Sequence, residues 1–76
     1  MERLAEFVKQ KRKLAQLTQE DLASRAGVAL TVIRKIEQNK GNLNLEKVNQ
    51  VLRMFGHELA PVSSKDLNPT NQEQPL

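Results

Sequence analysis

Residues 17–37 read LTQEDLASRAGVALTVIRKIE and contain two short helical patterns joined by a glycine. Thr18 can cap the first helix, and Asp21 three residues later completes a capping box in which Asp replaces the usual Glu. Gly27 suits the left-handed residue that ends a helix. A second helix is expected over residues 30–38, where apolar residues recur at helical spacing. The segment therefore predicts two helices set at a steep angle across a tight turn.

Helical patterns also flank this segment on both sides. The first spans about residues 2–15 and places on one side Leu4, Phe7, Val8 and Ala15. The last is capped by Asn44 and ends at Gly56. Its buried stripe is expected to contain Leu45, Val48, Val51, Leu52 and Phe55. We therefore predict an all-α fold, a compact bundle of four to five helices.

The chain after Gly56 has a different character. Residues 57–62 read HELAPV and combine polar and apolar side chains with Pro61, a residue that sheets tolerate at an edge, so we expect a short C-terminal β-strand there. Residues 63–76 are rich in Asn, Gln, Pro and Ser and have almost no apolar content, so we expect them to be disordered when free. The sequence thus predicts one folded domain over residues 1–62 and a disordered tail over residues 63–76.

Composition excludes several classes of protein. A chain of 76 residues allows one small domain, and the lack of cysteine removes disulfide frameworks, thiolate zinc sites and cysteine nucleophiles. His57 is the single histidine, and the sequence shows no cluster of metal ligands, no catalytic triad and no phosphate-binding glycine loop. We therefore expect neither enzyme activity nor a metal or cofactor.

Hydropathy bears on location and assembly. No apolar run reaches the roughly 20 residues that span a bilayer, and the N-terminus lacks the apolar stretch of a secretory signal. We expect a cytoplasmic protein that does not associate with membranes. The core of so small a domain is thin, which favours dimerisation.

The net charge of +3 is unevenly distributed. Of 12 basic and 9 acidic residues, only Lys65, Asp66 and Glu73 lie beyond residue 62, so the helical part is the more basic one. A small basic domain with few aromatic residues suggests a polyanionic partner such as nucleic acid. The same charge also fits an ordinary soluble surface.

The pattern of residues 17–23, 26–28 and 33–37 resembles the XRE/Cro family of helix-turn-helix regulators, whose members include the lambdoid phage repressors. The resemblance extends over about residues 4–59. It implies a lambda-repressor-like bundle, double-stranded DNA as the partner, and a recognition helix that enters the major groove. Residues 1–62 would then form a DNA-binding and dimerisation domain.

Residues 55–62, which read FGHELAPV, resemble the end of a subgroup, the HipB-like antitoxins. This resemblance implies that tail strands of two subunits pair across a homodimer. It also implies a HipA-like kinase toxin as partner and repression of the shared operon. The residues expected at the dimer contact are Phe55, His57, Leu59 and Val62.

The family resemblance also assigns roles to single residues. Those expected to contact DNA bases are Gln19, Leu30, Thr31 and Arg34. Those expected to contact phosphates are Thr18, Lys35, Lys40 and Asn42. A structural ion pair is expected between Arg12 and Glu37, holding the first helix against the end of the recognition helix.

The recognition helix departs from the family at its start. Leu30 and Val32 cannot form hydrogen bonds, so direct reading by them means contact with a thymine methyl group. Because the start of the recognition helix is so apolar, we expect the shape of the DNA to provide part of the specificity. Two roles are compatible with the position of Arg34, a bidentate contact with a guanine and a contact with a phosphate.

The leading hypothesis is a homodimeric, sequence-specific repressor of a palindromic operator that serves as the antitoxin of a HipBA-like operon. One alternative is a protein-interaction module that neutralises a toxin without specific DNA binding, using the apolar Leu30 and Val32 face. Another is a stand-alone repressor of the phage type.

Overall fold

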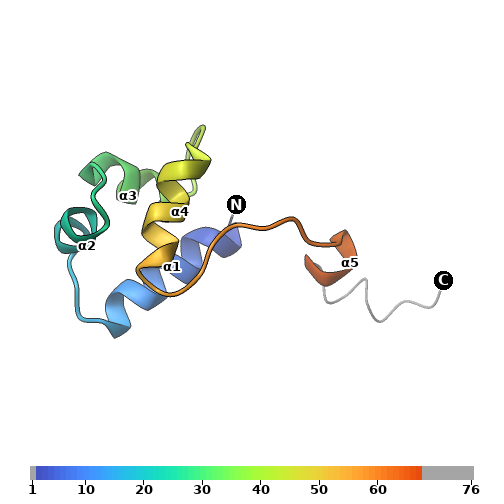
Figure 1. Cartoon of the computed structure of the whole chain (residues 1–76), viewed down its shortest axis with the longest axis horizontal. Coiled ribbons are helices and arrows are strands. Elements are labelled where there is room, and N and C mark those ends of the chain that lie inside the picture. Colours follow the sequence, from blue (N-terminus) through green and yellow to red (C-terminus); the bar gives the residue numbers. More distant parts are fainter. Residues whose placement is uncertain (1, 68–76) are drawn as a thin grey trace.

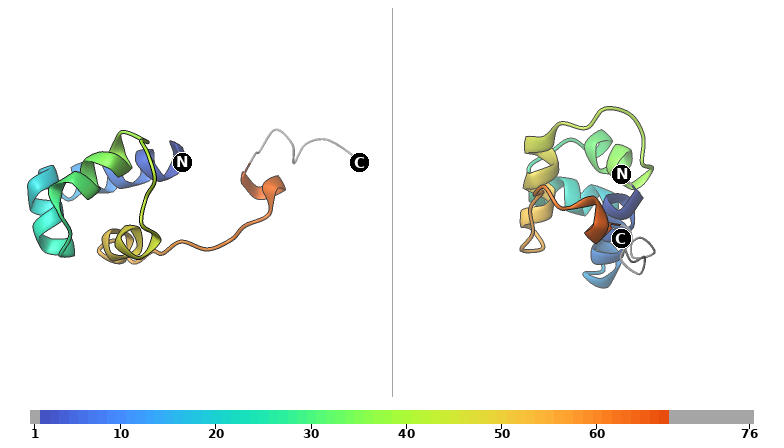
Figure 2. Two further views of the ribbon diagram at one scale, coloured as in Figure 1. Left: turned by 90° about the horizontal axis from the view of Figure 1, so that it is seen from above. Right: turned by 90° about the vertical axis from the view of Figure 1, so that its right-hand side faces the viewer.

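The computed structural model describes residues 2–67, in which the chain forms five helices. They are α1 (Glu2–Leu14), α2 (Gln19–Ala26), α3 (Leu30–Glu37), α4 (Leu45–Arg53) and α5 (Ser64–Leu67). Helices α1 to α4 form a compact bundle, and α5 lies apart from it beyond an extended segment (Figures 1 and 2). The predicted all-α helix-turn-helix bundle is confirmed for the described residues.

The hydrophobic core lies where α1 to α4 meet. Its fully buried side chains are Val8, Leu22, Ile33, Ile36, Val48 and Val51. Burial of each such side chain stabilises the folded state by about 1.5–3 kcal/mol relative to leaving it exposed to water. Two residues expected in the core lie outside it. Ala15 is exposed because α1 ends at Leu14, and Leu45 is 64% exposed because α4 enters the core only from Val48 onward.

Helix α2 is capped at both ends by residues that are close to it in the sequence. The Thr18 hydroxyl oxygen accepts a hydrogen bond from the Asp21 N–H at 3.0 Å, and the Asp21 carboxylate accepts one from the Thr18 N–H at 3.0 Å. At the other end, Gly27 has a φ of 74°, the left-handed conformation that glycine adopts without a steric penalty. The chain therefore turns sharply between α2 and α3.

The next two helices differ in what starts them. Helix α3 has no side-chain cap, because Ala29 at the cap position offers no oxygen. Helix α4 is capped by Asn44, whose side-chain oxygen accepts a hydrogen bond from the Lys47 N–H at 3.2 Å. The Gln50 side chain then donates to the Ala26 carbonyl at 3.4 Å and ties α4 to the end of α2.

The predicted C-terminal strand is not formed. Residues 57–63 run as a segment without regular structure, in which the Leu59 N–H donates to the Asn49 side-chain oxygen at 2.7 Å. A β-strand needs a neighbouring strand for its backbone groups, and residues 2–67 contain no second strand. Ser64–Leu67 form α5, where we expected no regular structure in the free chain. The remainder of the expected tail lies outside the described residues.

Candidate nucleic-acid interface

The outer face of α3 carries a polar stripe. Thr31, Arg34 and Lys35 are exposed, and so is Gln38, which caps the helix at its C-terminal end. These residues, which we call the α3 stripe, recur at helical spacing opposite the side that enters the core. An α-helix that presents such side chains outward has the form of a reader of the DNA major groove.

The apolar residues at the start of α3 are less open than the sequence suggested. Leu30 and Val32 are half-buried and pack against the core. Little of either side chain is therefore left for a partner. The apolar face that the interaction-module alternative would use is therefore smaller than the sequence suggested.

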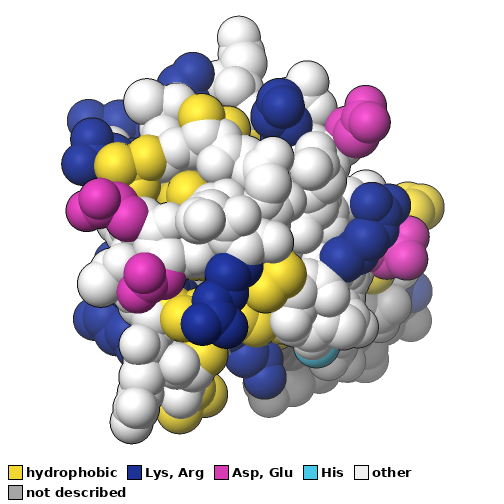
Figure 3. Space-filling view, turned by 60° about the vertical axis from the view of Figure 1, so that its left-hand side comes forward, with side chains coloured by type: hydrophobic (Ala, Val, Ile, Leu, Met, Phe, Trp, Pro, Cys, Tyr) yellow, Lys and Arg dark blue, Asp and Glu magenta, His cyan; other side chains and the backbone are white. Residues whose placement is uncertain are grey.

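All charges exposed on α3 are positive. Arg34 and Lys35 are exposed, whereas Glu37 is only 6% exposed and is neutralised by an ion pair with Arg12. Figure 3 brings forward the side of the molecule where α2 and α3 lie, and it shows basic side chains spread over this face with acidic ones among them. Burial of Glu37 thus gives the α3 stripe a local charge that favours a polyanion.

The loop after α3 continues this basic surface. Lys40 and Asn42 are exposed, and the chain turns in this loop through the left-handed conformations of Asn39 (φ 54°) and Gly41 (φ 70°). The Lys40 N–H donates to the Lys35 carbonyl at 3.1 Å, so this backbone donor is used inside the protein. The side chains of Lys40 and Asn42 therefore supply the groups that a phosphate would meet.

The N-cap residue of α2, Thr18, carries an exposed hydroxyl group. The exposed Thr18 hydroxyl oxygen accepts a hydrogen bond from the Asp21 N–H, and the O–H of the same group can donate either to the Asp21 carboxylate or to a phosphate oxygen. The pKa of Asp21 lies below its ordinary value, chiefly because the Thr18 backbone N–H donates to the carboxylate. The Thr18 side chain and the charge of Arg25 lower it further.

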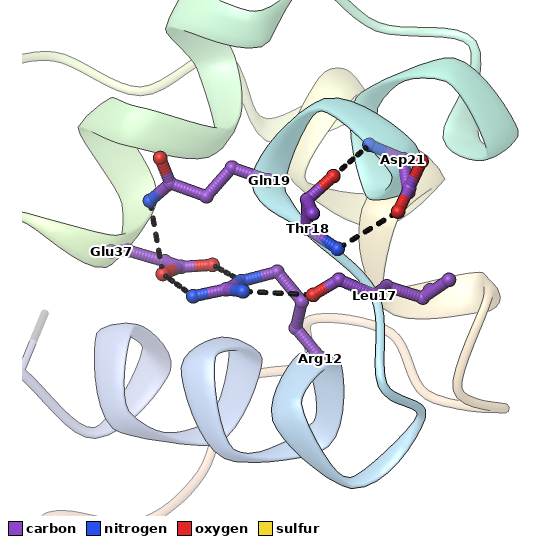
Figure 4. Close-up of polar contacts among 6 residues, drawn as sticks. All are labelled: Arg12, Leu17, Thr18, Gln19, Asp21 and Glu37. Atoms are coloured by element: carbon purple, nitrogen blue, oxygen red, sulfur yellow. Dashed lines mark hydrogen bonds and ion pairs between the residues drawn. The ribbon is translucent and has the colours of Figure 1, made fainter.

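A buried carboxylate joins three elements behind this surface (Figure 4). The Arg12 guanidinium donates from Nε to Glu37 Oε2 at 2.7 Å and from Nη2 to Glu37 Oε1 at 3.0 Å. The third nitrogen of the guanidinium, Nη1, donates to the Leu17 carbonyl oxygen at 2.9 Å. The Gln19 side-chain nitrogen donates to Glu37 Oε1 at 3.2 Å. The structure thus brings together Arg12 and Glu37, as the family resemblance implied, and adds Gln19 to the pair.

The four residues expected at a dimer contact have different surroundings. Phe55 and Leu59 are half-buried and pack against the core of their own chain. The ring of the exposed His57 lies 4.6 Å from the ring of Phe7, measured between centroids. Val62 is 54% exposed and is the one among the four that presents a large free apolar surface.

Two features of the site were missed by sequence reasoning. Gln38 belongs to the α3 stripe, and its spacing of seven residues from Thr31 was a usable signal. The hydrogen bond between Gln19 and Glu37 joins residues 18 positions apart, for which the sequence carries no local signal.

Other kinds of site are not found in residues 2–67. No group of three or more His, Cys, Asp or Glu side chains within that range could hold a metal ion. None of the helices there has both the length and the apolar character required to cross a bilayer.

Comparison with known proteins agrees with this geometry. A family model described as helix-turn-helix matches residues 8–60, which include α2, α3, α4 and most of α1. A comparison with curated proteins gave no match. On the matched range and the geometry of α2 and α3, the chain belongs to the XRE-type helix-turn-helix family of DNA-binding transcription regulators.

Proposed function

We propose that this regulator is a homodimeric repressor that inserts α3 of each copy into the major groove of a near-palindromic operator. The observation that carries the proposal is the α3 stripe, which presents polar and positive side chains outward. The one acidic side chain of α3, Glu37, is buried and paired. Two copies related by a two-fold axis place their α3 helices in successive grooves about 34–36 Å apart.

Within this proposal the DNA contacts divide by chemistry. Arg34 reads a guanine through two parallel hydrogen bonds, and Thr31, Gln38 and Gln19 supply further polar groups for base edges. The remaining surface of Leu30 contacts a thymine methyl group. Side chains assigned to phosphates are Thr18, Lys35, Lys40 and Asn42. Because half-buried Leu30 offers little contact, the shape of the operator supplies part of the specificity.

The experiment that tests this proposal is the selection of bound duplexes from a random pool at near-physiological salt. We expect an enriched two-fold motif whose half-site centres lie one helical turn apart or a multiple of it. Absence of an enriched motif, with weak and salt-sensitive binding to all duplexes, contradicts specific recognition. Binding to a protein partner with little salt dependence favours the interaction-module alternative instead.

We further propose that the repressor is an antitoxin that neutralises a HipA-like kinase toxin and represses its own operon. What supports this role is the segment that leaves the bundle after Leu59. It carries the exposed Val62 and ends in α5, which stands apart from α1 to α4 (Figure 1). Such a segment is free to bind a second protein while α3 is engaged with DNA.

The antitoxin role has its own test. A HipA-like kinase from the same genome is assayed alone, with the full chain, and with a chain ending at residue 62. The proposal expects inhibition and a stable complex with the full chain, and weaker inhibition by the shortened chain. A chain that binds its operator and leaves the kinase active is a stand-alone repressor.

A further inference from the structure

The side chain of Gln19 is held in one orientation by a buried carboxylate. Gln19 extends from the start of α2, and its Nε2 donates to Glu37 Oε1 at 3.2 Å. The Glu37 side chain is 2% exposed. An ionised carboxylate can only accept hydrogen bonds, so the nitrogen of the amide, and not its oxygen, must face Glu37.

Glu37 is itself prevented from turning. Both of its oxygens accept hydrogen bonds from Arg12, at 2.7 Å and 3.0 Å. Arg12 is anchored in turn by its bond of 2.9 Å to the Leu17 carbonyl, one residue before the cap of α2. The orientation of the Gln19 amide therefore depends on a rigid chain of contacts that begins in α1 and passes through the end of α3.

This orientation leaves a definite pair of groups for DNA. A primary amide is planar and has two N–H donors and one oxygen. Figure 4 shows the Gln19 oxygen turned away from Glu37, so the carboxylate occupies the N–H on the far side of the amide from that oxygen. The oxygen and the N–H beside it remain unused. This adjacent acceptor and donor match the N6 donor and N7 acceptor that adenine presents in the major groove.

We propose that Glu37 is a positioning residue for sequence recognition, which aims the Gln19 amide so that each subunit selects an adenine at one position of the operator half-site. The inference rests on the proposed DNA-binding function. It goes beyond that function because it assigns one base to a side chain on α2 and places its control in a buried residue of α3. Arg12 contributes indirectly, by holding Glu37.

The test is a double-mutant cycle on base discrimination. Dissociation constants are measured for the selected operator and for versions with each A·T pair of the half-site replaced symmetrically by G·C. The proteins are the full chain, Gln19→Met, Glu37→Asp and the double variant. Methionine keeps the length of Gln19 without its hydrogen bonds. Aspartate keeps a negative charge near Arg12, but its side chain is shorter by one methylene and reaches less far toward Gln19.

We expect the full chain to discriminate by about 5- to 150-fold at one symmetric A·T position, the range for a good bidentate pair. Gln19→Met should abolish this ratio, and Glu37→Asp should reduce it at the same position and at no other. The double variant should discriminate no worse than Gln19→Met. As the matched control, Lys35→Gln should weaken binding to all duplexes by a similar factor and leave the ratio unchanged.

Two outcomes overturn the inference. In one, Glu37→Asp lowers affinity for every duplex equally, which is the effect of a purely structural residue. In the other, Gln19→Met leaves every base preference intact. If the full chain enriches no sequence at all, the proposed function fails instead, so the two failures are distinguishable.

A measurement on the unaltered chain covers the case in which Glu37→Asp does not fold. In NMR spectra of the free protein, one side-chain amide proton of Gln19 should exchange slowly with solvent and the other rapidly. Equal and rapid exchange of both protons overturns the inference, because it means that Glu37 does not hold the amide.

Discussion

Arg12 and Glu37 are 25 residues apart in the chain and form a bidentate ion pair, with donor–acceptor distances of 2.7 Å and 3.0 Å. The pair joins α1 to the last residue of the recognition helix. The hydrogen bond to Glu37 raises the pKa of Arg12, against the opposing effect of burial, so Arg12 stays charged. Because the two parallel bonds fix direction as well as distance, the pair sets the orientation of α3.

Removal of the Arg12 side chain should destabilise the fold strongly. Arg12→Met leaves the buried Glu37 carboxylate without its main partner, which we expect to lower the free energy of unfolding by about 3 kcal/mol. Urea denaturation measures the change. The matched control is Lys13→Met, at the exposed neighbouring position, which should cost far less. The double variant Arg12→Met/Glu37→Leu should recover part of the loss, and a loss no larger than that of the control contradicts the role of the pair.

The cap of α2 should have a measurable effect on stability. Thr18→Ala removes the oxygen that accepts the Asp21 N–H at 3.0 Å, and a lost N-cap of this kind costs about 1 kcal/mol. Thermal unfolding at neutral pH is the measurement. Thr31→Ala, in the first turn of α3 and exposed, is the control and should be close to neutral. Equal stability of the two variants shows that the capping box contributes nothing.

The capping box of Thr18 and Asp21 also predicts that part of the stability of the folded chain is lost in acid. Hydrogen bonds from Thr18 lower the pKa of Asp21 in the folded chain. The ionised Asp21 carboxylate therefore stabilises the folded state, and this stabilisation is fully present above the ordinary Asp pKa of about 3.9. As the pH falls from about 4 through the lower folded value, that contribution is lost. The melting temperatures of the wild type and Asp21→Asn should therefore converge in acid. An NMR titration in which the Asp21 carboxyl titrates at or above its ordinary pKa contradicts this.

Two basic residues should differ in how they affect DNA binding. Arg34→Ala should cost on the order of 1–3 kcal/mol on the selected operator and relax specificity at one base pair. Lys40→Ala should weaken binding to all sequences similarly and lower the salt dependence of log K by about one charge. Titrations of both variants at several salt concentrations separate the two roles. A uniform loss from Arg34→Ala makes Arg34 a phosphate contact.

The proposed dimer contact should be sensitive to charge at Val62. This residue is 54% exposed, so Val62→Asp should weaken the dimer without disturbing the core, as judged by sedimentation velocity. Leu59→Asp should also weaken it, but Leu59 packs against its own chain and is the less selective probe. Leu14→Asp, at a position 72% exposed at the end of α1, is the control. A dimer that withstands Val62→Asp places the contact elsewhere.

The helices and their caps could be read from the sequence because they depend on near neighbours. Thr18 and Asp21 are three residues apart, and Gly27 ends α2 by its own left-handed backbone. Asn44 caps α4 in the same local way. The exposed face of α3 followed from periodicity alone, since burying one side of a helix exposes the opposite side.

Other features depended on contacts between distant segments. Ala29 cannot cap α3, so this helix relies on the packing of Ile33 and Ile36 against the other helices. Leu45 fits the apolar stripe of α4 but remains exposed, because the partners it would need lie deeper in the bundle. The predicted strand over residues 57–62 has no neighbouring strand in the described chain, and a local sequence pattern cannot provide one.

The sequence by itself determined where α2 and α4 are capped, that the chain turns at Gly27, and which face of α3 points outward, because each of these depends on residues within about two helical turns. The tertiary structure alone decided what Glu37 does. Its pairing with Arg12 and its hold on Gln19 join residues 25 and 18 positions apart, and they form only when α1, α2 and α3 pack together. Burial then makes the carboxylate a rigid acceptor, which no local pattern can reveal.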